Sequence, residues 1–351
     1  MAFNISSEPA LRVALAIGLA AFAATLALVV QVGVMRMVQR RRDAAAVATR
    51  DRWRPLLLRH AMGEAVALPA LATSQQAVFL LLWNQIADSL RGPSHDLLRS
   101  VILQLDLQTS ARRWLVGRNA RRQLLGVLTL GHLGSSVDGP DLRRRLGDPR
   151  TYMSIAAARA LLQVDAARAV DPVLDELARR PDWPTARLAG MLRGAGAEHV
   201  YEPLLRRLQQ DAATPSPQVV RLLAAVDAVR ASPTLVHLMQ RSDDTELLST
   251  CLQHVQTPDG LPRVRELARH PLWWMRVQAA AALGRLGDQE DRALLLALLT
   301  DKIWWVRYRA AIAFVRMPGL TPDAVAALGE GLGDPYARDI LRQALAEASV
   351  A

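Results

Sequence analysis

The residue types that most often perform catalysis are present in this sequence, but their spacing does not assemble them into a site. The single cysteine, Cys251, lies in the apolar run LLSTCLQHV, which favours a small buried side chain over a reactive thiol. No carboxylate pair stands out as an acid–base site, and there is no glycine-rich phosphate loop, Gly-x-Ser-x-Gly elbow or kinase signature. The histidines lack metal-ligand spacing; they are His60, His95, His132, His199, His237, His254 and His270. We therefore expect no enzymatic activity, no metal and no cofactor.

Two tryptophan pairs are the residues best suited to recognition. Each pair stands just before an arginine at the start of a predicted helix, and the two pairs lie 31 residues apart. Consecutive helical residues point about 100° apart, so one tryptophan of each pair is expected to pack between helices while the other faces solvent. The pairs fit two interpretations, aromatic packing between repeats or an exposed protein-binding hot spot. The candidate partner surface comprises Trp273, Trp274, Trp304, Trp305, Arg276 and Arg307.

The stretch 13–35 contains no charged residue and predicts a transmembrane helix. At about 1.5 Å per residue it reaches roughly 34 Å, enough for a hydrocarbon core of about 30 Å. A cleaved signal peptide would have a basic segment before a shorter apolar run, and a buried core helix would carry an amphipathic stripe. Residues 1–12 are then a short extracytoplasmic segment.

The flanking charges predict the orientation of this helix. Before it, Glu8 and Arg12 cancel, whereas the segment 36–54 is rich in arginine. The positive-inside rule places the N-terminus outside and the remainder in the cytoplasm, which predicts a single-pass protein of the inner membrane. The same arginines would also lie against the anionic inner leaflet. The membrane-proximal set is Arg36, Arg40, Arg41 and Arg42.

The rest of the chain has an internal period. The stretches that begin at His270 and Asp301 align with a shift of 31 residues, and the same shift from Arg307 gives Arg338. Such a fixed period indicates a solenoid, and each unit is expected to contain two helices separated by turn residues. Earlier counterparts of Arg307 in this alignment are Arg122, Ser154, Arg187, Arg221 and Ser249.

The repeat resembles HEAT repeats of the short bacterial kind that also occurs in phycobilin lyases. The residues that carry the likeness are Val306, Arg307, Ala310, Ala311 and Phe314, with Met275, Arg276, Ala279, Ala280, Leu283, Leu286 and Gly287. The resemblance implies an α-solenoid in which the arginine and a turn aspartate bond between neighbouring repeats. HEAT-like deoxyhypusine hydroxylases hold iron through His-Glu dipeptides, and this sequence contains none, which disfavours that activity.

The predicted architecture is all-α, with a transmembrane helix at 13–35, a basic juxtamembrane segment at 36–54, a helical cap at 55–118 and about seven HEAT-like repeats at 119–351. An apolar fraction of 51% with 22% charged residues excludes a disordered chain, and one cysteine excludes an intramolecular disulfide framework. This architecture predicts a membrane-anchored cytoplasmic scaffold that binds a partner protein of unknown identity.

Two alternative functions stay open. By analogy with phycobilin lyases, the solenoid could bind a tetrapyrrole-like ligand or act as a lyase. The net charge of +10 and the arginine clusters at 112–113, 118–122 and 143–145 raise nucleic acid as a partner. Interspersed acidic residues and the predicted tether make nucleic acid the less favoured partner.

Overall fold

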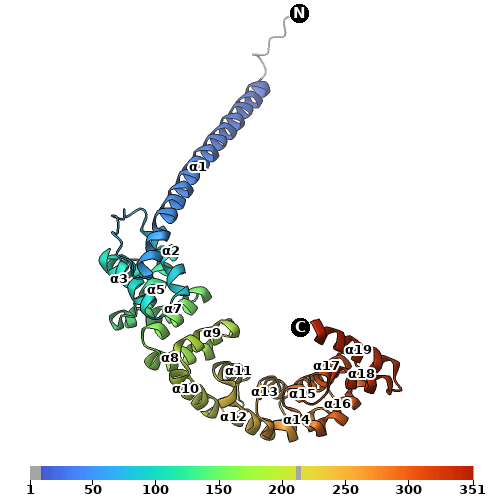
Figure 1. Ribbon diagram of the computed structural model, residues 1–351. Helices are drawn as coiled ribbons and strands as arrows, with labels where there is room; N and C mark the ends of the chain where they lie inside the picture. The colour runs from blue at the N-terminus through green and yellow to red at the C-terminus, as the bar shows by residue number, and fades with distance from the viewer. Residues whose placement is uncertain (1–8, 211–214, 351) are drawn as a thin grey trace, which may run out of the picture. The chain divides into compact units, whose positions relative to one another are not determined.

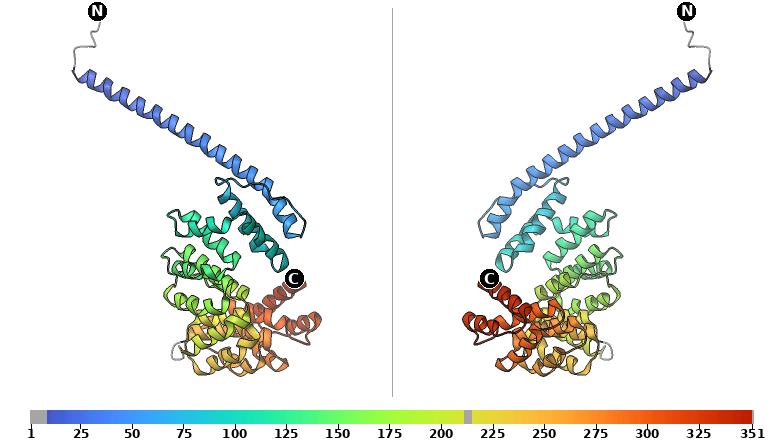
Figure 2. Two further views of the ribbon diagram at one scale, coloured as in Figure 1. Left: turned by 90° about the vertical axis from the view of Figure 1, so that its left-hand side faces the viewer. Right: turned by 90° about the vertical axis from the view of Figure 1, so that its right-hand side faces the viewer.

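The computed structural model describes residues 9–210 and 215–350, and all regular elements in these two ranges are helices (Figure 1). Two compact units divide the chain, one up to Asp141 and one from Leu142 onward. The all-α class and the helical solenoid predicted from the repeat pattern are confirmed. The views in Figure 2 show one long helix in the first unit and stacked helical hairpins in the second.

The helices that lie wholly within the first unit are α1 (Pro9–Ala61), α2 (Gln76–Ser89), α3 (Pro93–Gln104), α4 (Leu107–Val116) and α5 (Ala120–Leu133). They are followed by the short 3₁₀ turn η1 (Ser136–Asp138) and by α6 (Gly139–Leu146), which crosses the unit boundary.

The helices of the second unit alternate between the first and the second helix of each hairpin. They are α7 (Thr151–Val164), α8 (Ala166–Arg179), α9 (Thr185–Ala195), α10 (Ala197–Gln210), α11 (Pro217–Val226), α12 (Ala228–Arg241), α13 (Thr245–His254), η2 (Pro258–Gly260), α14 (Leu261–Leu267), α15 (Trp273–Leu286), η3 (Gln289–Asp291), α16 (Arg292–Leu299), α17 (Trp304–Val315), α18 (Pro322–Glu330) and α19 (Pro335–Val350).

Helix α1 is continuous over 53 residues, about 80 Å at the helical rise. It therefore runs through the predicted membrane segment 13–35 and basic segment 36–54 and enters the range 55–118 that was expected to form the cap. Its apolar part is exposed along the whole of the most hydrophobic window, whereas Trp53 and Leu57 near its end are buried. Pro55 does not interrupt the helix, which joins the apolar segment rigidly to the core of the first unit.

The core of the first unit forms around aromatic side chains from α1 and α2. The rings of Trp53 and Phe79 meet edge to face with centroids 4.7 Å apart, and both side chains are buried. The indole N–H of Trp83 donates to the carbonyl of Leu98 at 2.9 Å, which satisfies the polar atom of a fully buried ring. The end of α1 is thus an integral part of this unit.

Close packing of α4 against α5 determines where the first unit ends. A Cβ atom added at Gly126 would lie 2.6 Å from the carbonyl oxygen of Ala111, so only glycine permits this approach. The two helices form one hairpin across residues 117–119. This hairpin belongs to the first compact unit, which extends to Asp141.

In the second unit the helices form two layers. The first helices α9, α11, α13, α15, α17 and α19 lie on the inner side of the arc in Figure 1, and the second helices α8, α10, α12, α14 and α16 lie on its outer side. Small residues allow neighbouring first helices to approach, as a Cβ atom at Gly284 of α15 would lie 2.7 Å from that of Ala313 in α17. Asp165 and Asp227 begin second helices by accepting hydrogen bonds from the backbone of Arg168 and Arg230.

The repeat period is visible in the residues that precede the first helices. Leu272 and Ile303 are the N-caps of α15 and α17, and Asp334, at the next step of 31, accepts a hydrogen bond from the backbone of Arg338. Arg276, Arg307 and Arg338 each stand four residues after these positions, as aligned from the sequence. In α11 the corresponding residue is the buried Val220, beside the partly exposed Arg221. The sequence alignment is therefore one residue out of register there, because an apolar side chain fills the slot that arginine occupies later.

Candidate partner-binding surface

The tryptophan pairs lie at the amino-terminal ends of α15 and α17. Trp273 is 43% exposed, Trp304 44% and Trp305 57%, whereas Trp274 is half-buried. The expected division into one buried and one exposed ring per pair is not observed at Trp304-Trp305, where both rings face solvent. The two rings contact each other and Tyr308, which lies on the same helix.

Three further contacts extend this surface toward α19. Trp304 stacks on Tyr308 with centroids 5.0 Å apart and planes inclined by 9°, and it meets Trp305 edge to face at 4.8 Å. The guanidinium of Arg307 lies 5.6 Å from the ring centroid of Tyr336, which is 70% exposed. We call the set Trp273, Trp304, Trp305, Tyr308 and Tyr336 the aromatic edge.

Tyr308 and Tyr336 were not among the residues selected from the sequence. The signal for Tyr308 is its position four residues after Trp304, on the same helix face. The signal for Tyr336 is the repeat period itself, since Trp274, Trp305 and Tyr336 follow one another at intervals of 31 residues.

Arg276 is engaged within the solenoid. Its Nε and Nη2 atoms donate to the Asp301 carboxylate at 2.7 and 2.9 Å, and its Nη1 donates to the carbonyls of His270 and Pro271. The HEAT resemblance implies such an arginine–aspartate bond between neighbouring repeats, and this contact has that form. Burial raises the pKa of the Asp301 carboxyl, but hydrogen bonds from Arg276 and the Ile303 amide outweigh it and leave the pKa below its ordinary value.

Arg307, the equivalent residue one repeat later, has no carboxylate partner within the described ranges. Its Nη1 donates to the backbone carbonyl of Asp301 at 3.1 Å, and its Nε is buried without an acceptor. The two arginines that the sequence grouped together therefore differ. Arg276 joins two repeats, whereas Arg307 retains unused donors beside exposed aromatic rings.

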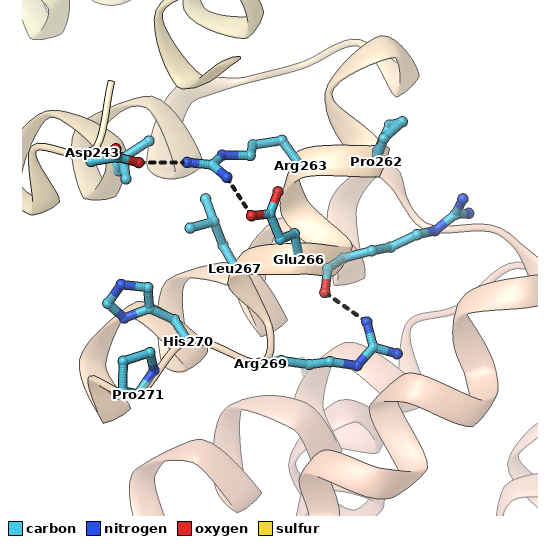
Figure 3. A pocket seen from close by; sticks show the side chains of 10 residues that line it. Asp243, Pro262, Arg263, Glu266, Leu267, Arg269, His270 and Pro271 are labelled. Carbon is cyan, nitrogen blue, oxygen red and sulfur yellow. Dashed lines mark hydrogen bonds and ion pairs between the residues drawn. The ribbon is translucent and has the colours of Figure 1, made fainter. Parts of the chain in front are cut away.

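A hollow of about 730 Å³ lies beside α14, close to the start of α15 (Figure 3). Arg263 bridges Asp243 at 3.3 Å and Glu266 at 2.5 Å, and Arg265 pairs with Asp291 at 2.6 Å. Arg269 donates to the carbonyl of Arg265 at 3.2 Å. Because ion pairs already use most of these charges, the hollow offers little free electrostatic attraction.

Two groups of titratable side chains bear on chemistry. Cys251 is fully buried, and burial raises its pKa to about 12, so the thiol stays protonated at neutral pH. In the first unit, His132 Nε2 lies 2.7 Å from an Asp88 oxygen, and His132 Nδ1 lies 3.3 Å from His95 Nε2. Sequence reasoning did not find this relay because its members come from three helices. In the part of the chain that the structure describes, no group of three potential ligands could hold a metal ion.

The membrane-proximal arginines follow the apolar part of α1 without a break in the helix. Arg36 and Arg40 stand four residues apart on one face, and Arg41 and Arg42 turn onto the other faces. All four side chains are exposed, so they surround the helix as a belt of positive charge.

Comparison with known proteins found HEAT repeats in part of the chain. A family model described as HEAT repeats matches residues 249–315, which include α15, α17 and both tryptophan pairs. Among solved structures the chain is similar to importin beta crystallised in an ammonium sulfate condition, with 15% sequence identity and a TM-score of 0.36. That alignment covers 85% of this chain and 41% of the importin beta chain, so this chain spans less than half of that structure. The search of curated proteins gave no match. Residues 249–315 thus match HEAT repeats, and the helical hairpins of the second unit form an α-solenoid in the residues that the structure describes.

Proposed function

We propose that this chain is a membrane-anchored scaffold of the inner membrane whose cytoplasmic HEAT repeats bind a partner protein through the aromatic edge, without catalysing a reaction themselves. The anchor raises the local concentration of the partner at the membrane and reduces its search to two dimensions. The observation that carries the proposal is the joint exposure of Trp304 and Trp305 on a repeat whose arginine has no carboxylate partner in the described residues.

The apolar helix supports the membrane part of this proposal. Leu15–Ala61 is the described helix that is long and apolar enough to span a bilayer, with a window of mean hydropathy 2.3 that has none of its side chains buried in the protein. An exposed apolar helix of this length is costly in water and stable in lipid. The arginine belt at residues 36–42 supports the orientation with the N-terminus outside.

The aromatic edge supports the partner part. Tryptophan, tyrosine and arginine are the residues most enriched in protein-binding hot spots, and solvent exposure of several rings together leaves apolar area available for burial. Stacking of Trp304 on Tyr308 fixes the ring orientation before a partner arrives, which lowers the entropy cost of binding.

Proximity labelling from the carboxyl terminus in living cells tests the partner-binding function. The double variant Trp304→Ala with Trp305→Ala is expected to lose labelling of a specific membrane-associated neighbour. Tyr152→Ala is the matched control, because Tyr152 is an exposed aromatic residue near the start of α7 with 46% of its surface accessible. Equal labelling by the wild type and both variants would contradict the assignment of the aromatic edge.

Topology is tested with introduced thiols, because the native Cys251 is buried. Ser6→Cys is expected to react with a membrane-impermeant maleimide in intact cells, and Lys302→Cys only after the membrane is opened. The reverse pattern would contradict the proposed orientation, and recovery of the full-length protein in the soluble fraction would contradict the anchor.

A further inference from the structure

A group of basic side chains on the first-helix layer has no role in the function proposed above. Arg221 belongs to α11, His254 to α13, Arg285 to α15 and Arg309 to α17, and these helices follow one another along the inner layer in Figure 1. Each helix packs on the next. We call these four residues the cation ladder.

Arg285 has the most unusual surroundings in the cation ladder. Its Nη2 donates to the carbonyl of Leu252 at 2.6 Å and its Nη1 to the carbonyl of Ala281 at 3.2 Å, so its described partners are backbone oxygens and not carboxylates. Surrounding protein atoms desolvate the guanidinium and lower its pKa, and the positive charge of Arg309 lowers it further. The side chain nevertheless remains open to solvent.

The pKa of His254 is also affected by arginines of the neighbouring repeats. Burial lowers the pKa of its imidazole, and the charges of Arg285 and Arg221 lower it further. The effect of both arginines on one ring places three members of the ladder within electrostatic reach of each other. Like charges gathered on a partly desolvated wall repel one another, and a bound anion would relieve this repulsion.

Carboxylates do little to neutralise the ladder. Within the described residues its one acidic contact joins Arg221 Nη2 to Glu246 at 3.6 Å, and the Glu246 side chain is 72% exposed. Elsewhere in the second unit, basic residues commonly have close acidic partners, as Arg265 has in Asp291 and Arg276 in Asp301. The absence of such partners at the ladder leaves a local positive potential.

A structural role explains only part of the ladder. Arg285 donates to the carbonyl of Leu252 in the last turn of α13, and cations commonly stabilise helix carboxyl ends in this way. Arg309 lies within α17, is exposed, and makes no described hydrogen bond or ion pair, so helix capping does not explain it. Its positive charge acts on Arg285 without a described carboxylate to offset it.

We propose that the cation ladder binds an acidic segment of the partner protein. Neighbouring packed helices lie about 8–10 Å apart, so the successive first helices that carry these basic residues follow one another at about that interval. Carboxylates seven residues apart on an α-helix are separated by about 10.5 Å along its axis. A helical segment with acidic residues at this interval therefore matches the ladder in charge and matches the spacing of the helices that carry it.

Nucleic acid and lipid fit this surface less well. A nucleic-acid interface commonly neutralises about six to ten phosphates, and the ladder offers three arginines and one histidine whose pKa is lowered. A lipid surface is flat, whereas the helices that carry these residues lie on the inner side of the arc in Figure 1. The inference rests on the proposed function only in that the ligand is a protein, and it concerns residues other than those of the aromatic edge.

Fluorescence anisotropy with the full-length protein in neutral detergent tests the ladder. The probe is an alanine-based helical peptide with glutamates seven residues apart, and its control is the same peptide with glutamines. The wild type is expected to bind the glutamate peptide and not the glutamine peptide. Arg309→Glu, a change at an exposed side chain, is expected to weaken binding about tenfold. Arg241→Glu makes the same change of charge on α12, in the other layer, and is expected to change the affinity less than about twofold.

Each outcome decides the inference. Selective loss of binding in Arg309→Glu, together with a rise in the His254 pKa on peptide addition seen by NMR, supports the ladder. Equal effects of the two substitutions, or no binding of the glutamate peptide by the wild type, overturn it. Ladder-dependent binding of single-stranded DNA or of phosphatidylglycerol nanodiscs in place of the peptide also overturns it. None of these results alters the test of the aromatic edge, which uses Trp304 and Trp305.

Discussion

The repeats that begin at α15 and α17 carry nearly the same residues and yet differ in what those residues do. Both start with two tryptophans followed two positions later by an arginine. Arg276 is held by Asp301, which lies two residues before the N-cap of the next first helix. The equivalent position before α19 holds Leu332, so Arg307 has no carboxylate there.

The role of the repeated Trp-Trp-x-Arg motif therefore depends on the residues of the repeat that follows it. The aspartate that holds Arg276 is supplied by the next turn along the chain, and its replacement by leucine one repeat later leaves a guanidinium beside exposed rings. An identical arginine is structural in one repeat and available for recognition in the next.

Removal of the carboxylate at Asp301 is expected to have the largest effect. Both side chains of the Arg276–Asp301 pair are largely buried, at 16% and 11% exposure, so Asp301→Ala leaves Arg276 without its partner in a poorly solvated site. The expected loss of stability is about 3 kcal/mol, measured by urea unfolding. Arg307→Gln is the comparison and is expected to cost less than about 1 kcal/mol, because it breaks no ion pair. Equal losses in the two variants would remove the distinction between the repeats.

The close contact between these two repeats gives the next largest effect. Gly284→Ala places a methyl group 2.7 Å from the Cβ of Ala313 and is expected to destabilise the protein by about 2 kcal/mol in thermal unfolding. Gly194→Ala in α9 meets nothing within 4 Å and is expected to stabilise by up to about 1 kcal/mol through helix propensity. A neutral Gly284→Ala would show that α15 and α17 are less tightly packed than described.

Acid titration sharpens the comparison further. The pKa of Asp301 is lower in the folded chain than in an unfolded one, so the ionised carboxyl stabilises the fold above its unfolded pKa. This contribution is lost as the pH falls through the folded pKa of Asp301. The dependence of unfolding free energy on pH below about 4 is therefore expected to flatten most in Arg276→Gln, which removes hydrogen bonds to the carboxyl, and less in Arg307→Gln, which removes only a smaller charge effect. The same slope in both variants would contradict a special role for Arg276.

The smallest expected effect is a gain in stability. Leu332→Asp places a carboxylate where the Asp301 pattern requires one, and it is expected to stabilise the protein by about 1 kcal/mol in urea unfolding. It should also weaken labelling of the partner, since Arg307 would then be engaged within the solenoid. If Leu332→Asp strengthened partner labelling, Arg307 would have no part in recognition.

The sequence predicts those parts of the molecule that depend on periodicity and length. The uncharged stretch 13–35 and the 31-residue period indicate the long apolar helix and the helical hairpins, because both follow from local pattern. The hairpin of α4 and α5 was missed because its key residue, Gly126, acts through a close approach that leaves no periodic signal.

The candidate surface was only partly predictable, because exposure is a tertiary property. The tryptophans are prominent in the sequence, but whether a ring is covered depends on the residues of the following repeat. Tyr336 could be predicted from the 31-residue period, whereas the cation ladder depends on side chains from four helices at unequal intervals in the sequence. No single-repeat pattern contains that information.

Photo-crosslinking at position 305 tests the central claim most directly. Full-length protein with a photoreactive phenylalanine analogue in place of Trp305, irradiated in its native membrane, is predicted to give a discrete crosslinked product. The same analogue in place of Tyr152 is predicted to give none. A membrane-bound, folded protein that forms no product at position 305, or the same products at both positions, would contradict the account.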